Sequence, residues 1–184
     1  MIIAKFFAGL RKGRLVGRSV LQRGYLRIAF PSIRCHPSVR FGRGVHIRAF
    51  AGGSAVIGAN TRFDDFASVQ IEFGRLEIGR NCLIGRGNVI VCVERIAIGD
   101  GSLLAEYVTL HDHDHRHQGA GSLDRQGWAS APIVIGEEVW LAAKVSVMKG
   151  VEIAPHAVVG ANAVVSRSLP ERGVYAGVPA KRIG

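Results

Sequence analysis

The first 63 residues contain no acidic side chain, since the first acidic residue is Asp64. The same stretch carries 12 of the 24 Lys and Arg residues, whereas the remaining 121 residues hold 12 basic and 14 acidic side chains. The formal net charge of +10 is therefore a property of the N-terminal third. No recognised nucleic-acid-binding module accompanies this charge, so we expect no nucleic acid partner.

The chain also lacks an apolar run long enough to cross a bilayer, which takes about 20 residues. Residues 1–10 are mostly apolar, but their strong positive charge follows the apolar run, which is the wrong order for a secretory signal. The three cysteines are odd in number and have no metal-type spacing, so no disulfide framework is indicated. We therefore expect a cytoplasmic protein.

The basic N-terminal segment, residues 1–35, allows two interpretations. Within residues 1–31, aliphatic and aromatic side chains alternate with Lys and Arg, a composition that suits peripheral association with an anionic membrane at its inner face. The other interpretation is a cap that closes one end of the fold and is solvated by its arginines. The sequence leaves both open.

Aliphatic residues recur every six positions in the C-terminal half of the chain. This period matches neither a helix (3.6) nor strand alternation (2), so it indicates a repeat architecture. One ladder comprises Ile135, Leu141, Val147, Ile153, Val159 and Val165. A second ladder, four positions further on, comprises Val139, Val145, Val151, Ala157 and Ala163.

Each hexapeptide predicts one short strand and one corner. Small residues after the inward aliphatic, such as Gly136 and Gly160, are expected to let the backbone turn sharply. Upstream, Ile-Gly pairs at positions 57, 78 and 98 are 21 and 20 residues apart, which is three hexapeptides plus extra residues at a corner. Three hexapeptides per coil predict an all-β chain, a parallel β-helix shaped as a triangular prism over residues 36–169. Phe41-Gly42 and Ile47 indicate an earlier, degenerate coil.

The ladder breaks once, between Leu110 and Ile133. Four of the seven histidines fall in this interruption, at positions 111, 113, 115 and 117, together with several acidic residues. A loop of this length within a compact repeat is usually functional. An imidazole that titrates near neutrality and a carboxylate that orients it suit acid–base catalysis, so residues 111–132 are the predicted catalytic loop.

Three C-terminal segments resemble a known family. These are Ile135-Gly-Glu-Glu-Val-Trp-Leu-Ala142, Val159-Gly-Ala-Asn-Ala-Val-Val165 and Ala176-Gly-Val-Pro-Ala-Lys-Arg-Ile183. They resemble the hexapeptide-repeat acyltransferases, within them the maltose/galactoside and polysaccharide O-acetyltransferase branch, over residues 55–184. The resemblance implies a left-handed β-helix, a homotrimer, and acetyl-CoA bound as co-substrate in clefts between subunits. The left hand departs from the usual rule for parallel strands and follows from the resemblance alone.

The resemblance implies that one loop histidine is the general base. In the family this histidine lies about five residues beyond a Val-Thr-Leu-like segment, here residues 108–110, which selects His115. Other saccharide-modifying members carry an Asp-His-x-His pattern, matched here from Asp112 onwards, which makes His113 the rival. We favour His115, and His111 and His117 are weaker alternatives.

The same resemblance implies a set of cofactor-binding residues. Trp140 is expected beside the catalytic loop and the acetyl group. Three small residues are expected to line the pantetheine cleft, and two basic residues, one of them in the C-terminal tail (170–184), to lie near the CoA phosphates. These five are Ala143, Gly160, Ala161, Arg167 and Lys181.

A zinc site is the alternative use of the histidines. The γ-type carbonic anhydrases share the left-handed helix and use a His-x4-His pair among their zinc ligands. The loop histidines here are separated by one, three or five residues, never four, so we predict no metal.

Together these features predict an O-acetyltransferase. It would move acetyl directly from acetyl-CoA to a hydroxyl of a polysaccharide or of a lipid-linked glycan precursor, with histidine as the base. The alternatives are an N-acyltransferase or antibiotic acetyltransferase of the same fold and, in another class, a non-catalytic β-helix scaffold at a membrane surface.

Overall fold

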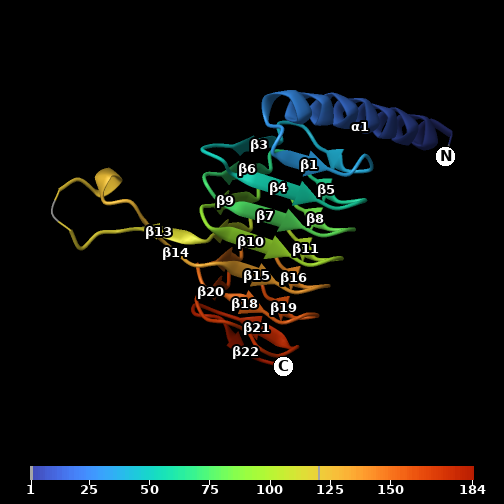
Figure 1. Cartoon of the computed structure of the whole chain (residues 1–184). Coiled ribbons are helices and arrows are strands. Elements are labelled where there is room, and N and C mark those ends of the chain that lie inside the picture. Colours follow the sequence, from blue (N-terminus) through green and yellow to red (C-terminus); the bar gives the residue numbers. More distant parts are fainter. Residues whose placement is uncertain (1, 120) are drawn as a thin grey trace.

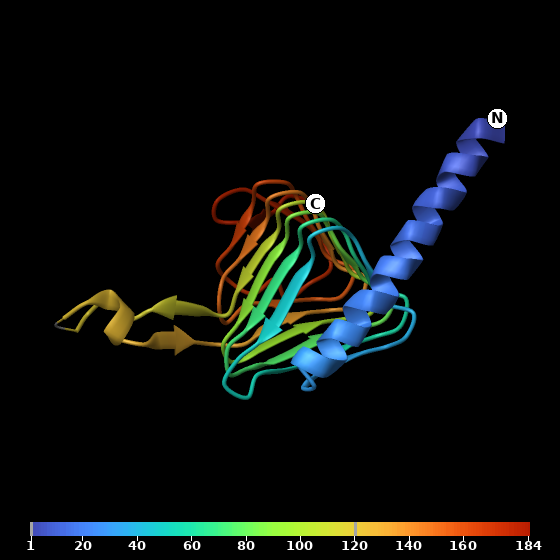
Figure 2. The same cartoon turned by 90° about the horizontal axis from the view of Figure 1, so that it is seen from above.

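The computed structural model describes residues 2–119 and 121–184, and it describes side chains for residues 15–119, 121–123 and 125–184. The chain winds into a three-sided parallel β-helix, which confirms the predicted fold class (Figure 1). Short strands stack into three flat sheets, and Figure 2 shows their triangular outline from above.

Each face contains one strand from each complete coil, and the second face has two further strands at its C-terminal end. The first face consists of β1 (Ile33–Cys35), β4 (Ser54–Ile57), β7 (Arg75–Ile78), β10 (Arg95–Ile98), β15 (Ile133–Ile135) and β18 (Glu152–Ile153). The second face consists of β2 (Arg40–Phe41), β5 (Arg62–Phe63), β8 (Leu83–Ile84), β11 (Leu103–Leu104), β16 (Trp140–Leu141), β19 (Val158–Val159), β21 (Val174–Ala176) and β22 (Lys181–Arg182). The third face consists of β3 (His46–Ala49), β6 (Ser68–Ile71), β9 (Val89–Cys92), β12 (Thr109–His111), β17 (Ser146–Val147) and β20 (Val164–Val165).

The interior of the prism is filled by the residues that the six-residue period predicted. Every member of both ladders is buried. The degenerate first coil also exists, and its Phe41 stacks on Phe63 of the next coil with ring centroids 5.4 Å apart. The core is therefore a single column of mainly apolar side chains.

The extra residues of the N-terminal coils lie at one corner, as predicted. The register pairs Ile33 with Ala55 in the first two coils but Ile135 with Ile153 near the C-terminus, so a coil shortens from 22 to 18 residues. The extra residues lie where the chain passes from the third face to the first face of the next coil. This corner, which also bears the 111–132 loop, is called the loop corner below.

The small residue after each inward aliphatic has a different role from the predicted one. Gly58 and Gly99 do not have positive φ angles; the corner residues that do include Asn81 (57°) and Glu138 (52°). A Cβ on Gly58 would lie 2.6 Å from a backbone atom of Gly79 in the next coil. Glycine is therefore needed because coils stack closely, not because the backbone turns there.

One helix, α1 (Ile2–Ala29), lies across the N-terminal end of the prism, and its first half extends past the prism edge (Figures 1 and 2). The all-β prediction did not include this helix. The buried Ser19 accepts a hydrogen bond at Oγ from the Phe41 N–H (2.9 Å), and Arg23 donates to the Val39 carbonyl (2.7 Å). Leu26 is also buried against the first coil. The helix was hard to anticipate because a polar serine occupies the middle of its inner face.

Among the described residues, no helix is both long and apolar enough to cross a membrane.

Candidate active site

The interruption of the ladder is a hairpin that projects sideways from the prism (Figure 1). The chain leaves the third face after β12, forms β13 (His113–His115), a short 3-10 turn η1 (Leu123–Arg125) and β14 (Trp128–Ser130), and returns at β15. Strands β13 and β14 pair antiparallel, with His113 opposite Ser130 and His115 opposite Trp128. The predicted loop therefore has regular structure at its base.

Asp112 anchors the base of this hairpin. Its side chain is fully buried and accepts three backbone hydrogen bonds, from the N–H groups of Val93 (2.8 Å), Glu94 (2.8 Å) and Arg95 (2.9 Å) at the loop corner of the coil above. A carboxylate held by three donors is fixed in position. Asp112 is thus placed to orient a neighbouring side chain.

His113 is the histidine that this carboxylate orients. Its Nδ1 lies 3.3 Å from the Asp112 Oδ1, and its side chain is only 11% exposed. Its ring packs edge-on against Trp128 (5.6 Å between centroids) and stacks near His111 (5.9 Å). A carboxylate beside Nδ1 favours the tautomer that leaves Nε2 unprotonated and able to accept a proton.

His115 lies further along the hairpin in a more open setting. It packs edge-on against the same Trp128, 6.1 Å between centroids, but its side chain is exposed. Within the described part of the chain, no side-chain hydrogen bond orients His115 or His117. The structure therefore brings His113 and His115 to one tryptophan but supplies a carboxylate partner only to His113.

His111, the last residue of β12, has a lowered pKa. Burial is the main cause, and repulsion from His113 adds to it, while Asp112 and Asp114 act in the opposite direction. Because protonation of His111 is disfavoured, its imidazole beside His113 favours the neutral form.

Three residues to which the sequence assigned no role complete the environment. Trp128 lies between His113 and His115, and Phe73 from the loop corner of an earlier coil packs against Trp128 at 5.8 Å. Lys149, at the loop corner of the next coil along the chain, forms an ion pair with Asp114 (2.9 Å). Stacking brings these corners together, and no local spacing in the sequence signals it.

A cavity of about 570 Å³ opens beside the hairpin. It is lined by Asp114, His115, Arg116, His117, Gln126 and Lys149, among others. Several of these residues carry charged or amide groups, which can donate or accept hydrogen bonds to a polar ligand.

The residues expected to bind the cofactor lie mostly elsewhere. Trp140 begins β16 on the second face and is half exposed. Ala143, Gly160 and Ala161 lie at the corner between the second and third faces, and Lys181 is in β22 at the edge of the second face. Arg167 alone follows a strand of the third face, β20, on the side of the loop corner. Within one chain, these side chains and the loop histidines are not assembled into one site.

In the described residues, no group of three or more His, Cys, Asp or Glu side chains is arranged to hold a metal ion.

Comparisons with known proteins give the family. Residues 132–167 match the model of the bacterial transferase hexapeptide family (six repeats). The chain is 33% identical over 189 residues to a putative lipopolysaccharide biosynthesis O-acetyl transferase, WbbJ, of Escherichia coli, covering 92% of this chain and 86% of that protein. It is 33% identical over 157 residues to a probable acetyltransferase of Mycobacterium tuberculosis, covering 84% of this chain but only 52% of that longer protein.

Solved structures share the fold. The N-acyltransferase AntD of Bacillus cereus, in complex with dTDP and 3-hydroxybutyryl-CoA, superimposes with a TM-score of 0.73 at 20% identity, covering 88% of this chain and 86% of that one. An acetyltransferase of Vibrio cholerae complexed with acetyl-CoA gives a TM-score of 0.60 at 21% identity, covering 94% and 83%. Given the match of almost the whole chain to WbbJ, the stacked six-residue ladder and the family model, the chain belongs to the hexapeptide-repeat acyltransferases.

Proposed function

We propose that this protein is an O-acetyltransferase that moves acetyl from acetyl-CoA to a hydroxyl of a saccharide. The observation that carries the proposal is the Asp112–His113 pair at the root of the hairpin, a largely enclosed imidazole oriented by a fixed carboxylate. The names of relatives support the acceptor class: WbbJ, and the galactoside O-acetyltransferase of Escherichia coli, 34% identical over 120 residues. A polysaccharide or lipid-linked glycan precursor is the proposed acceptor.

We assign the general base to His113. Spacing within the family favoured His115, but the local contacts favour His113, and His115 remains the rival. In the reaction, Nε2 of the base accepts the proton of the acceptor hydroxyl while that oxygen attacks the thioester carbonyl carbon. The C–S bond then breaks, the CoA sulfur leaves and takes up a proton, and no covalent enzyme intermediate forms. Asp112 stabilises the imidazolium that exists between the two proton transfers.

We propose that the active unit is a homotrimer. The loop histidines and Trp140 lie on different faces of one prism, so a neighbouring copy is required to bring a second face against the hairpin. In this arrangement Ala143, Gly160 and Ala161 would contact pantetheine, and Arg167 and Lys181 the phosphates. We place the trimer in the cytoplasm, with its basic N-terminal segment (residues 1–35) at the inner membrane face.

Acetyl transfer to a panel of saccharides tests the assignment. We expect His113→Ala to lose about 10²–10⁴-fold in kcat/KM while the protein remains folded, since that is the usual contribution of a general base. His115→Ala should lose far less, and His46→Ala, an exposed histidine on β3, serves as the matched control. The reverse result, a dead His115→Ala and an active His113→Ala, would return the assignment to His115.

Transfer to an amine is the second candidate activity, because the AntD complexes include one with dTDP-4-amino-4,6-dideoxyglucose. Supplying amino sugars and their hydroxyl analogues in the same assay separates the two. A non-catalytic scaffold is tested by CoA binding: a hundredfold excess over Kd should stabilise a binding protein by about 2.7 kcal/mol, and a scaffold not at all.

A further inference from the structure

The N-terminal end of the prism carries positive charge that the fold leaves without acidic partners. In the part of the chain whose side chains are described, Arg43 and Arg62 form ion pairs with Asp65 and Asp64. No described carboxylate pairs with the other arginines at this end, which are Arg18, Arg23, Arg27, Arg34, Arg40 and Arg48. Charge with no internal partner is available to an external anion.

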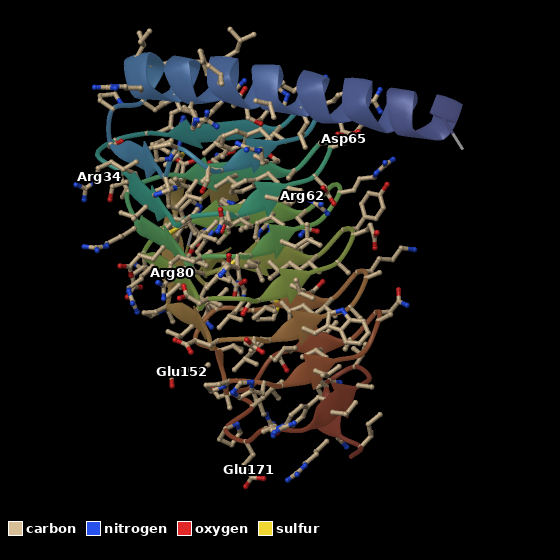
Figure 3. The ribbon with its side chains drawn as sticks, turned by 90° about the vertical axis from the view of Figure 1, so that its right-hand side faces the viewer. Arg34, Arg62, Asp65, Arg80, Glu152 and Glu171 are labelled. Atoms are coloured by element: carbon tan, nitrogen blue, oxygen red, sulfur yellow. The ribbon has the colours of Figure 1, made fainter. Side chains whose placement is uncertain are left out.

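Three of these arginines line one cavity. It has a volume of about 570 Å³, lies between the last turns of α1 and the first coil, and is lined by Arg23, Arg27 and Arg34. Its remaining walls are mainly apolar, with Leu26, Pro31 and Ile33 among them. Figure 3 shows Arg34 at the edge of the first coil, beneath the C-terminal end of the helix.

The same end exposes apolar side chains that point away from the prism. Leu21 is 77% exposed and Ile28 85% exposed, and helical spacing places both opposite the buried Ser19 and Leu26. Tyr25, 53% exposed, lies beside them. The outer surface of α1 thus combines an apolar strip with flanking arginines, as in helices that lie in a membrane interface.

We propose that the cavity lined by Arg23, Arg27 and Arg34 binds the phosphate of an anionic phospholipid, with Leu21 and Ile28 inserted into the bilayer interface. This inference rests on the proposed association of the N-terminal segment with membrane and gives it a defined site. Arg23 is held in place by its bond to the Val39 carbonyl and retains further N–H donors. The guanidinium groups match phosphate, and the apolar walls match the carbon chain beyond it.

Docking in this way fixes the orientation of the enzyme. Because α1 lies across the end of the prism, the prism axis would stand along the bilayer normal and the hairpin would point parallel to the membrane (Figure 1). The hairpin leaves the fourth coil, which lies three strand spacings below the first, about 14 Å. The diameter of α1 adds about 10 Å, so the histidines lie roughly 25 Å from the bilayer surface. A membrane-linked acceptor would therefore be modified at a sugar well away from its lipid.

Vesicle sedimentation of the full chain tests the site. Vesicles of pure phosphatidylcholine are compared with vesicles that contain phosphatidylglycerol. On both, the cavity variant Arg27→Gln/Arg34→Gln is compared with the control variant Arg18→Gln/Arg48→Gln. Both double variants remove two charges from the same end, but only the first alters the cavity. We expect selective binding to phosphatidylglycerol, a loss of about tenfold or more for the cavity variant, and a much smaller loss for the control.

Several outcomes would overturn the proposal. Equal losses in the two double variants would mean diffuse electrostatic attraction without a phosphate site. Cys35 also lines the cavity, so a bound ligand should protect it from alkylation. If inorganic phosphate protected Cys35 as strongly as short-chain phosphatidylglycerol, the cavity would be a phosphate site without lipid recognition. If Leu21→Glu/Ile28→Glu changed the oligomeric state but not vesicle binding, the helix surface would be a contact between copies.

Acetyl transfer to a soluble saccharide separates this inference from the proposed function. The cavity variants should retain full activity there, because they lie at the end of the prism away from the hairpin. Loss of vesicle binding with retained transfer supports the lipid site, whereas absent transfer in the unaltered protein would defeat the enzymatic proposal and leave the lipid site standing.

Discussion

The β-helix body and the inserted hairpin follow opposite rules of construction. In the body, buried and mainly apolar side chains recur at the same inward positions from coil to coil, and backbone groups bond to the coils above and below. In the hairpin, two three-residue strands pair only with each other, and most side chains are exposed. The comparison shows that a stacked repeat commits its residues to stacking, so polar groups able to do chemistry gather where the repeat is interrupted.

The largest expected effect lies in the body. Phe63→Ala should reduce the free energy of unfolding by about 3–5 kcal/mol, because Phe63 is fully buried and stacked on Phe41. Phe73→Ala is the matched change at the loop corner, where the ring is 56% exposed, and it should cost far less. Denaturant titration of both measures the difference, and equal losses would contradict the contrast between the buried column and the corner that carries the hairpin.

The next effect concerns the residue that joins the hairpin to the body. Asp112→Ala should cost about 3 kcal/mol, because it leaves three backbone N–H groups without their charged acceptor. Asp114→Ala, on the exposed strand of the hairpin, should change stability by at most about 1 kcal/mol. An Asp112→Ala protein as stable as the parent would show that the hairpin is held by other contacts.

A smaller effect should appear as a pH dependence of stability. The folded pKa of His111 lies below its unfolded value of about 6.5, so the unfolded chain binds the proton first as the pH falls. The contribution of His111 is therefore complete above about pH 6.5 and declines below it. Thermal unfolding at a series of pH values should show a shallower acid decline in His111→Gln than in the parent, and an unchanged slope would contradict this expectation.

The smallest effect concerns the ion pair that ties the hairpin to the coil below. Lys149→Met should alter global stability by at most about 1 kcal/mol, because the Lys149 and Asp114 side chains are 31% and 49% exposed. Its effect should be local: amide hydrogen exchange should accelerate in β13 and β14 but not in β15 or β18. Faster exchange throughout the first face would mean that the hairpin and the body do not open independently.

Much of the architecture was predictable because it is encoded by a local period. Ladder residues such as Ile135 and Val147 indicate an inward-facing position every six residues. The spacing of the Ile-Gly pairs indicates the number of faces. The helix α1 was not predictable in the same way, since its inner face combines Ser19 and Gln22 with Leu15 and Leu26. The role of the corner glycines was also misjudged, because the contact that excludes a Cβ at Gly58 comes from a residue 21 positions later.

The sequence alone determined a three-sided stacked repeat, a single interruption rich in histidine, and a charge concentrated at one end. Those properties depend on residue type and on spacing within one coil. Only the tertiary structure decided that Asp112 is locked by the backbone of the coil above, that Phe73 and Lys149 meet the hairpin, and that Arg23, Arg27 and Arg34 share a cavity. The contacts of Asp112, Phe73 and Lys149 exist because stacking brings corners of different coils into register, whereas the arginine cavity exists because α1 packs across the first coil.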